Sequence, residues 1–201
     1  MPTVYIAGPD LFFRDTWTAH CARVAALCES MGLTPVFPVS PAAPITGPGV
    51  TSDAAPAAAR PIYESCIRAI QNSDAVLANF GWFRGTEPGS GTVWEAATAK
   101  AMGKIVVAYI DHRTGGVEPG MSYRTARDGA WIGSNKAVIE RFGLPMNLMP
   151  FCGVDRLITE AEADDPLAEG LRYLRGMFDL RASQKSTTPA LRPELRKLKL
   201  R

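Results

Sequence analysis

The sequence has 201 residues, of which 46% are hydrophobic and 21% charged, a balance typical of a soluble globular domain with a buried core. Its formal net charge is +2. The four cysteines form no C-x-x-C pair and the chain has only two histidines, so we expect no metal site. No apolar run approaches the roughly 18 residues of a membrane span, and the initial MPTVYIAGP lacks a signal peptide's basic start and long apolar centre. We therefore expect a cytoplasmic protein with no membrane contact.

Apolar runs and helical spacing predict alternating strands and helices along the chain. The predicted strands are residues 3–8, 34–38, 74–80, 104–110 and a short one near 151–154. The predicted helices are residues 15–31, 63–72, 92–102 and 167–177, with a short one near 135–141. Residues 38–61, rich in Pro, Gly, Ala and Ser, predict a long loop. The alternation predicts an α/β fold, with about five parallel strands covered by helices on both faces.

Charge is distributed unevenly along the chain. Residues 181–201 carry seven Lys or Arg and one Glu, whereas the remaining 180 residues carry 15 Lys or Arg and 19 Asp or Glu. Because the last segment is also rich in Ser, Thr and Pro, we expect one domain over residues 1–180 and a basic, flexible tail over 181–201. Such a tail can instead contact an acidic partner. The acidic body gives no support for nucleic-acid binding, and we expect none.

Two polar segments leave the carboxyl ends of predicted strands, YIAGPD (5–10) and FGWFRGTEPGSG (80–91). Ligands of doubly wound sheets bind beyond the carboxyl ends of the strands, so we expect the functional site there. The second segment runs through Gly89, Ser90 and Gly91 into a helix that carries Glu95. Small residues before a helix let a ligand approach the backbone closely.

Glu95 has two interpretations from the residues alone. With Thr92 it fits a capping box, in which the Thr hydroxyl and the Glu carboxylate each bind a free backbone N–H of the first turn. Alternatively, a carboxylate behind a loop of small residues can attack an electrophilic carbon whose leaving group departs into a pocket. The spacing of Thr92 and Glu95 leaves both interpretations open.

Four strings, in order, resemble the nucleoside 2-deoxyribosyltransferases, most closely their protozoan-type members. They are VYIAGPDLFF (4–13), IRAIQNSDAVLANF (67–80), FRGTEPGSGTVWEAATAKAMGK (83–104) and FGLPMNLMPFCG (142–153). The resemblance implies a flavodoxin-like fold and a two-step exchange of the base on a 2-deoxynucleoside, with the free base as second substrate and no cofactor. It also implies a homo-oligomer with shared active sites.

The resemblance assigns roles to four residues. Glu95 matches the nucleophile, which forms a covalent deoxyribosyl ester at C1′, and Tyr5 matches the tyrosine that holds that carboxylate. Asn147 and Met149 match residues that contact the sugar in the site of a neighbouring subunit. Without the resemblance, Tyr5 in mid-strand is an ordinary core residue and Asn147 after a proline is an ordinary turn residue.

Further substrate-binding residues are expected on the two loops. Asp10 and Phe12 follow the first strand, although Asp10 is equally placed to cap the next helix. Gly89, Ser90 and Gly91 line the approach to Glu95. Phe12 and Phe13, together with Trp82 and Phe83, are placed to close the pocket, and a core role is the alternative for the last two.

Two positions depart from the family's pattern. Gly89 stands where the family commonly has an acid serving the base, and Cys66 stands where it has an Asp or Asn. These departures keep two alternatives open. One is an N-glycoside hydrolase of a nucleoside or nucleoside 5′-monophosphate, for which Arg60, Arg84 and Ser90 form a partial phosphate cradle. The other is a catalytically silent nucleoside-binding module.

Overall fold

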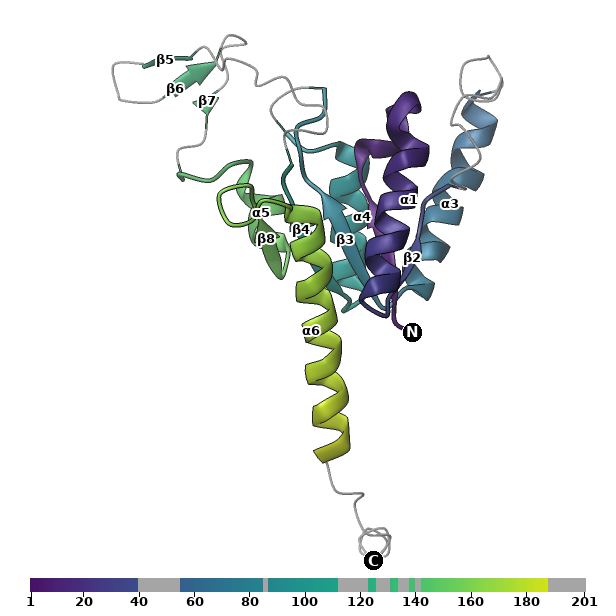
Figure 1. Ribbon diagram of the computed structural model, residues 1–201. Coiled ribbons are helices and arrows are strands. Elements are labelled where there is room, and N and C mark those ends of the chain that lie inside the picture. Colours follow the sequence, from purple (N-terminus) through teal and green to yellow (C-terminus); the bar gives the residue numbers. More distant parts are fainter. Residues whose placement is uncertain are drawn as a thin grey trace, which may run out of the picture.

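The computed structural model describes residues 1–39, 55–84, 87–111, 123–125, 131–133, 138–139 and 142–187. Its main sheet has five parallel strands in the order β2-β1-β3-β4-β8 (Figure 1). They are β1 (Thr3–Ala7), β2 (Thr34–Val36), β3 (Ala75–Asn79), β4 (Ile105–Tyr109) and β8 (Arg156–Ile158). Counted among themselves, the strands run 2-1-3-4-5, which is the order of the flavodoxin-like fold that the family resemblance implied.

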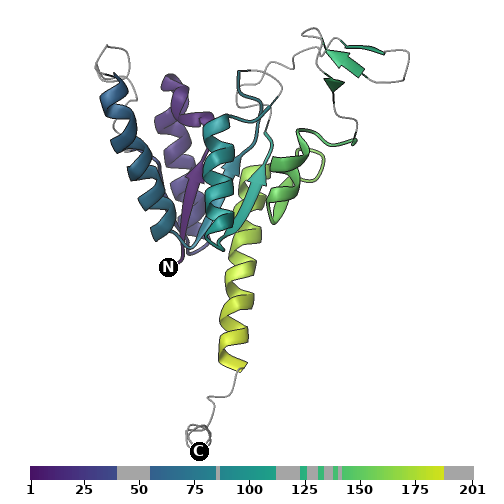
Figure 2. The ribbon, with the colours of Figure 1, turned by 180° about the vertical axis from the view of Figure 1, so that it is seen from behind.

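Helices cover both faces of this sheet (Figures 1 and 2). The helices α1 (Arg14–Ser30) and α6 (Pro166–Thr187) pack on one face, and α3 (Ala55–Asn72) and α4 (Ser90–Ala101) pack on the other. The strands are buried on both sides because their residues alternate between the two layers: Val4 and Ile6 face the first pair of helices, and Tyr5 and Ala7 face the second. A short helix η1 (Pro9–Phe12) follows β1.

Two predicted elements are wrong. Residues 148–153 form the helix α5 (Leu148–Gly153) in place of a strand, and β8 follows it. A short apolar run does not distinguish strand from helix, and here Asn147 decides, because its Oδ1 accepts a hydrogen bond from the Met149 backbone N at 2.9 Å and caps the helix. The predicted helix near 135–141 is also wrong, since β7 (Val138–Ile139) lies within it and pairs with β6 (Trp131–Gly133), which pairs with β5 (Tyr123–Thr125).

Two helices are longer than the sequence predicted. Helix α3 begins at Ala55 and contains Pro61, because the Ala-rich stretch before the proline favours helix strongly. The first part of the predicted 38–61 loop lies outside the described residues. Helix α6 runs to Thr187, so residues 181–187 of the predicted tail are helical; the rest of the tail lies outside the described residues.

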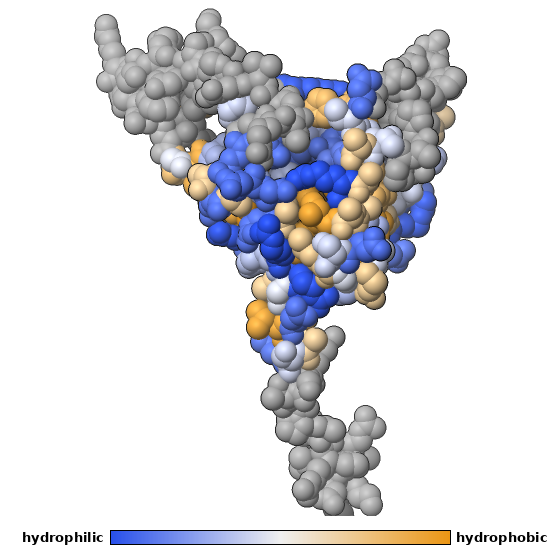
Figure 3. Space-filling view, in the orientation of Figure 1, coloured by the Kyte–Doolittle hydropathy of each residue, from blue (hydrophilic) through white to orange (hydrophobic). Residues whose placement is uncertain are grey.

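The surface of the α1 and α6 face is mostly hydrophilic. Figure 3 shows hydrophilic side chains around a narrow hydrophobic strip at the centre of this face. Among the described residues, no helix is both long enough and apolar enough to cross a membrane.

Candidate active site

The side chains of Tyr5 and Glu95 meet between the sheet and α4. Tyr5, the third residue of β1, is fully buried, and its hydroxyl donates a hydrogen bond to Glu95 Oε1 at 2.6 Å. Helix α4 begins at Ser90 with Gly89 as its N-cap, so Glu95 lies in the second turn and its first turn holds no acidic residue. The capping-box interpretation of Glu95 is therefore wrong.

Burial and hydrogen bonds act in opposite directions on this pair. Burial raises the pKa of Glu95, while hydrogen bonds from Tyr5 and Cys66 lower it. Burial and the neighbouring Glu95 raise the pKa of Tyr5 far above its ordinary value, so the hydroxyl keeps its proton and acts as a donor. The pair thus presents a carboxylate held by a neutral phenol.

Cys66 is the third member of this cluster. It lies one turn before the buried Ile70 on the inner side of α3, close enough to Tyr5 and Glu95 to influence the pKa of both. Burial raises the pKa of its thiol, so Cys66 is a neutral S–H group at neutral pH. From the sequence Cys66 was only a departure from a family pattern; its contact with Glu95 depends on how α3 packs against α4.

Asp10 lies in a different polar cluster, behind the loop that follows β1. Its two carboxylate oxygens accept hydrogen bonds from Asn79 Nδ2 at 3.2 and 3.0 Å, and His20 Nδ1 lies 3.6 Å from Asp10 Oδ1. Helix α1 has Phe13 at its N-cap and no side-chain cap, so the interpretation of Asp10 as a helix cap is wrong. Asn79, the last residue of β3, was missed from the sequence because a polar residue at a strand end gives no signal of its partner.

Aromatic residues from two loops gather at the carboxyl ends of β1 and β3. The Phe12 and Phe83 rings stack with centroids 5.3 Å apart and planes 20° apart, and Phe13 meets Phe83 edge-on at 6.3 Å. The Arg84 guanidinium lies 4.7 Å from the Phe83 centroid. Phe12 stays 49% exposed, so this cluster is open to solvent.

The loop before α4 brings the next group of predicted residues beside this cluster. Gly89 is buried with φ −57°, and a Cβ added there would lie 3.3 Å from Phe83 Cδ1. Ser90 and Gly91, in the first turn of α4, are exposed. Glu87 Oε2 accepts a hydrogen bond from the Asn147 backbone N at 3.2 Å, which ties this loop to the start of α5. Met149, on α5, is 71% exposed.

The sequence matches a known protein family over most of its length. Residues 4–149 match the family model described as nucleoside 2-deoxyribosyltransferase. The matched range contains Tyr5, Glu95, Asn147 and Met149. The chain belongs to the nucleoside 2-deoxyribosyltransferase family.

The chain is also similar to solved structures. A 2-desoxiribosyltransferase from Leishmania mexicana is 28% identical, with a TM-score of 0.57, over 86% of this chain and 99% of its own. A 2-deoxyribosyltransferase from Bacillus psychrosaccharolyticus is 20% identical (TM-score 0.40; 58% of this chain, 77% of its own). A CMP N-glycosidase from Clostridium botulinum is 17% identical (TM-score 0.36; 54% and 71%). No curated protein matches the chain.

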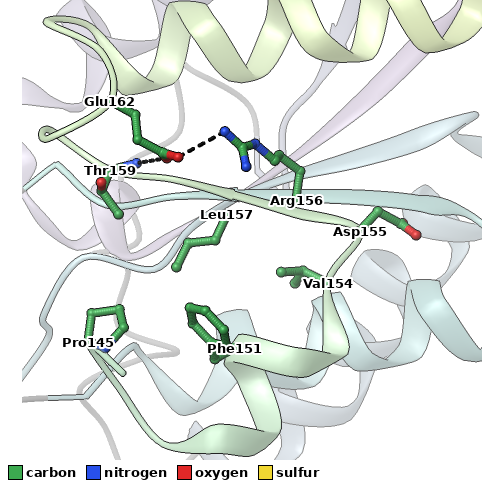
Figure 4. A pocket seen from close by; sticks show the side chains of 8 residues that line it. All are labelled: Pro145, Phe151, Val154, Asp155, Arg156, Leu157, Thr159 and Glu162. Atoms are coloured by element: carbon green, nitrogen blue, oxygen red, sulfur yellow. Dashed lines mark hydrogen bonds and ion pairs between the residues drawn. The ribbon is translucent and has the colours of Figure 1, made fainter. Parts of the chain in front are cut away.

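A hollow of about 480 Å³ lies between α5 and β8 of this deoxyribosyltransferase-family chain (Figure 4). Most of the residues that line it follow residue 149, where the family match ends. Pro145, Phe151 and Leu157 point into it, and its charged groups are paired: Arg156 with Glu162 at 2.9 Å, and Asp155 with Lys100 at 2.7 Å. Tyr5 and Glu95 do not line it.

Proposed function

We propose that the protein is a nucleoside 2-deoxyribosyltransferase that exchanges the base of a 2-deoxynucleoside through a covalent ester on Glu95. The observation that carries the proposal is the 2.6 Å hydrogen bond from the buried Tyr5 to Glu95, in a chain of this family. The hydroxyl fixes the orientation of the carboxylate and leaves its second oxygen for attack on carbon.

The reaction has two displacements at C1′. First, a Glu95 oxygen forms a bond to C1′ as the C1′–N bond breaks, and the base leaves with the bonding electron pair and gains a proton. Then a nitrogen of the second base attacks C1′ and gives up its proton, the C1′–O bond of the ester breaks, and Glu95 is a carboxylate again. Two displacements return the original configuration, as in retaining glycosidases. The Tyr5 hydroxyl stabilises the carboxylate as it re-forms.

The site offers less for binding and protonating the nucleobase than for forming the ester. Gly89 has no side chain to serve as an acid, Glu87 accepts a hydrogen bond from Asn147, and Asp10 accepts two from Asn79. These observations favour hydrolysis as the second candidate function, in which water attacks the ester in place of a base. We expect exchange to be slow, or confined to few bases, with a share of the ester lost to water.

The test is to incubate the protein with deoxyinosine and adenine and to separate the products by chromatography. New deoxyadenosine supports the exchange, and free hypoxanthine without deoxyadenosine shows a hydrolase. Binding of deoxyinosine without conversion shows a nucleoside-binding module. Glu95→Gln is the matched control, because it keeps the size of the side chain and an acceptor for Tyr5 while removing the nucleophile.

We also propose that sites are shared between copies of the chain in a homo-oligomer. The strongly exposed Met149 at the start of α5 and the 60% exposed Trp94, next to Glu95 on α4, support a contact between copies at this side. Mixing Glu95→Ala subunits with Asn147→Ala subunits, each inactive alone, should then restore part of the activity. A monomer in light scattering at full activity would rule this out.

A further inference from the structure

The loops that leave β1 and β3 are joined by a buried polar pair, Asp10 and Asn79. The two side chains are 6% and 1% exposed. Asn79 Nδ2 donates to both Asp10 oxygens, and Asn79 Oδ1 accepts a hydrogen bond from the Gly81 backbone N at 2.9 Å. The Asn79 side chain therefore binds both its own loop, after β3, and the loop after β1.

The backbone of both loops leaves room for this pair. A Cβ added at Gly8 would lie 2.4 Å from Asp10 Oδ2 and 2.9 Å from Asn79 Cβ. A Cβ added at Gly81 would lie 2.9 Å from Asn79 Oδ1. A glycine stands on each side because the backbone approaches the pair too closely for a side chain, so the two loops have little freedom to shift relative to each other.

Each loop carries half of the aromatic cluster. Phe12 comes two residues after Asp10, and Phe83 comes four residues after Asn79. The two rings stack on each other, and Phe83 also lies against Gly89, the N-cap of the helix that holds Glu95. A chain of contacts thus runs from the Asp10–Asn79 pair through Phe12 and Phe83 to the N-cap of the helix that holds Glu95.

We propose that Asn79 is a positioning residue for base binding: through Asp10 it holds Phe12 against Phe83, and the exposed side of this aromatic stack takes the nucleobase. The inference rests on the proposed function. A flat aromatic surface that is half exposed at the carboxyl edge of the sheet suits the π face of a base, and stacking tolerates different bases. Asn79 touches no substrate atom in this arrangement and acts by fixing the two loops.

The experiment compares single and exchanged variants of the pair. Asn79→Asp removes the donor and sets two carboxylates about 3 Å apart, and Asp10→Asn removes the charged acceptor. The double variant Asp10→Asn/Asn79→Asp restores one donor and one acceptor in exchanged places. We expect KM for the deoxynucleoside to rise roughly 10-fold in each single variant, as when one base stack is lost, with a smaller change in kcat. The double variant should recover most of the KM.

Two further variants separate base binding from stability. Phe12→Ala removes an exposed ring and should raise KM by a similar factor without unfolding the protein, even where Asn79→Asp folds poorly. Asp74→Asn is the matched control: Asp74 joins the same two strands at their amino ends, where Oδ2 accepts hydrogen bonds from the Thr3 backbone N (2.7 Å) and hydroxyl (2.9 Å). It should leave KM unchanged.

The outcomes distinguish this inference from the proposed function. If the native protein shows neither exchange nor hydrolysis, the proposed function fails, and the dissociation constant of deoxyinosine for the native protein and Phe12→Ala then tests the stacking surface by itself. If the native protein is active but Phe12→Ala leaves KM unchanged, the inference is overturned. It is overturned equally if the exchanged pair recovers the melting temperature and not the KM.

Discussion

Removing the Tyr5 hydroxyl should slow the breakdown of the ester more than its formation. In Tyr5→Phe, the carboxylate of Glu95 loses the 2.6 Å hydrogen bond but keeps the surrounding packing. A hydrogen bond to a charged group contributes about 1.5–3 kcal/mol, and each 1.36 kcal/mol is tenfold in rate. The carboxylate is a nucleophile in the first step and the leaving group in the second, so the donor stabilises its developing charge in the second. We expect kcat to fall roughly 10- to 150-fold, with the ester accumulating.

The same substitution should move the pH profile. Because Glu95 attacks as a carboxylate, the rate rises with pH through its pKa, which burial raises above the ordinary value. Tyr5 lowers that pKa, so Tyr5→Phe should shift the acidic limb of kcat/KM to higher pH. The assay is steady-state exchange of deoxyinosine with adenine across pH, with single-turnover measurement of the ester. An unchanged kcat together with an unchanged acidic limb would refute the role assigned to Tyr5.

Three further predictions concern residues around this pair. Glu95→Gln should abolish turnover yet raise the melting temperature at pH 7. The pKa of Glu95 is higher in the folded than in the unfolded protein, so the carboxyl destabilises the fold progressively as pH rises from the unfolded-state pKa through the folded-state pKa. Equal melting temperatures of the variant and the native protein across pH would contradict this. Cys66→Ala should shift the acidic limb to higher pH and Cys66→Ser should not, since only the first removes the donor; identical profiles would exclude a role for the thiol. Gly89→Asp should raise the transfer rate for purines relative to Gly89→Ala, because it supplies an acid for the departing base. The backbone admits the new side chain, since φ is −57° and the Cβ requires only a small movement of Phe83. A lower transfer rate in both variants would show that the change of loop conformation, not the missing acid, limits the rate.

The fold was predictable because its signals are local. Apolar runs such as 75–79 and 105–109 identify strands, and alternation with helices leads to a parallel sheet. The failures were also local: residues 151–154 are apolar and short, and only the cap by Asn147 selects a helix. The helix predicted over 63–72 began too late, because the alanines before Pro61 carry helix across the proline.

The candidate site was predictable only in part. The Tyr5–Glu95 contact joins residues 90 positions apart, and the family resemblance, not the spacing, brought them together. Asn79 and Cys66 gave no such signal. Their partners are chosen by how β3 lies beside β1 and how α3 packs on α4, and both are tertiary contacts that no local pattern encodes.

The ester on Glu95 is the central claim, and mass spectrometry of peptides tests it directly. The protein is incubated with deoxyinosine without an acceptor base, quenched with acid and digested. A peptide that contains Glu95 should carry the mass of one deoxyribosyl group, more abundantly in Tyr5→Phe and never in Glu95→Gln. Exchange by the native protein with the deoxyribosyl group on another residue, or undiminished exchange by Glu95→Gln, would contradict the proposed mechanism.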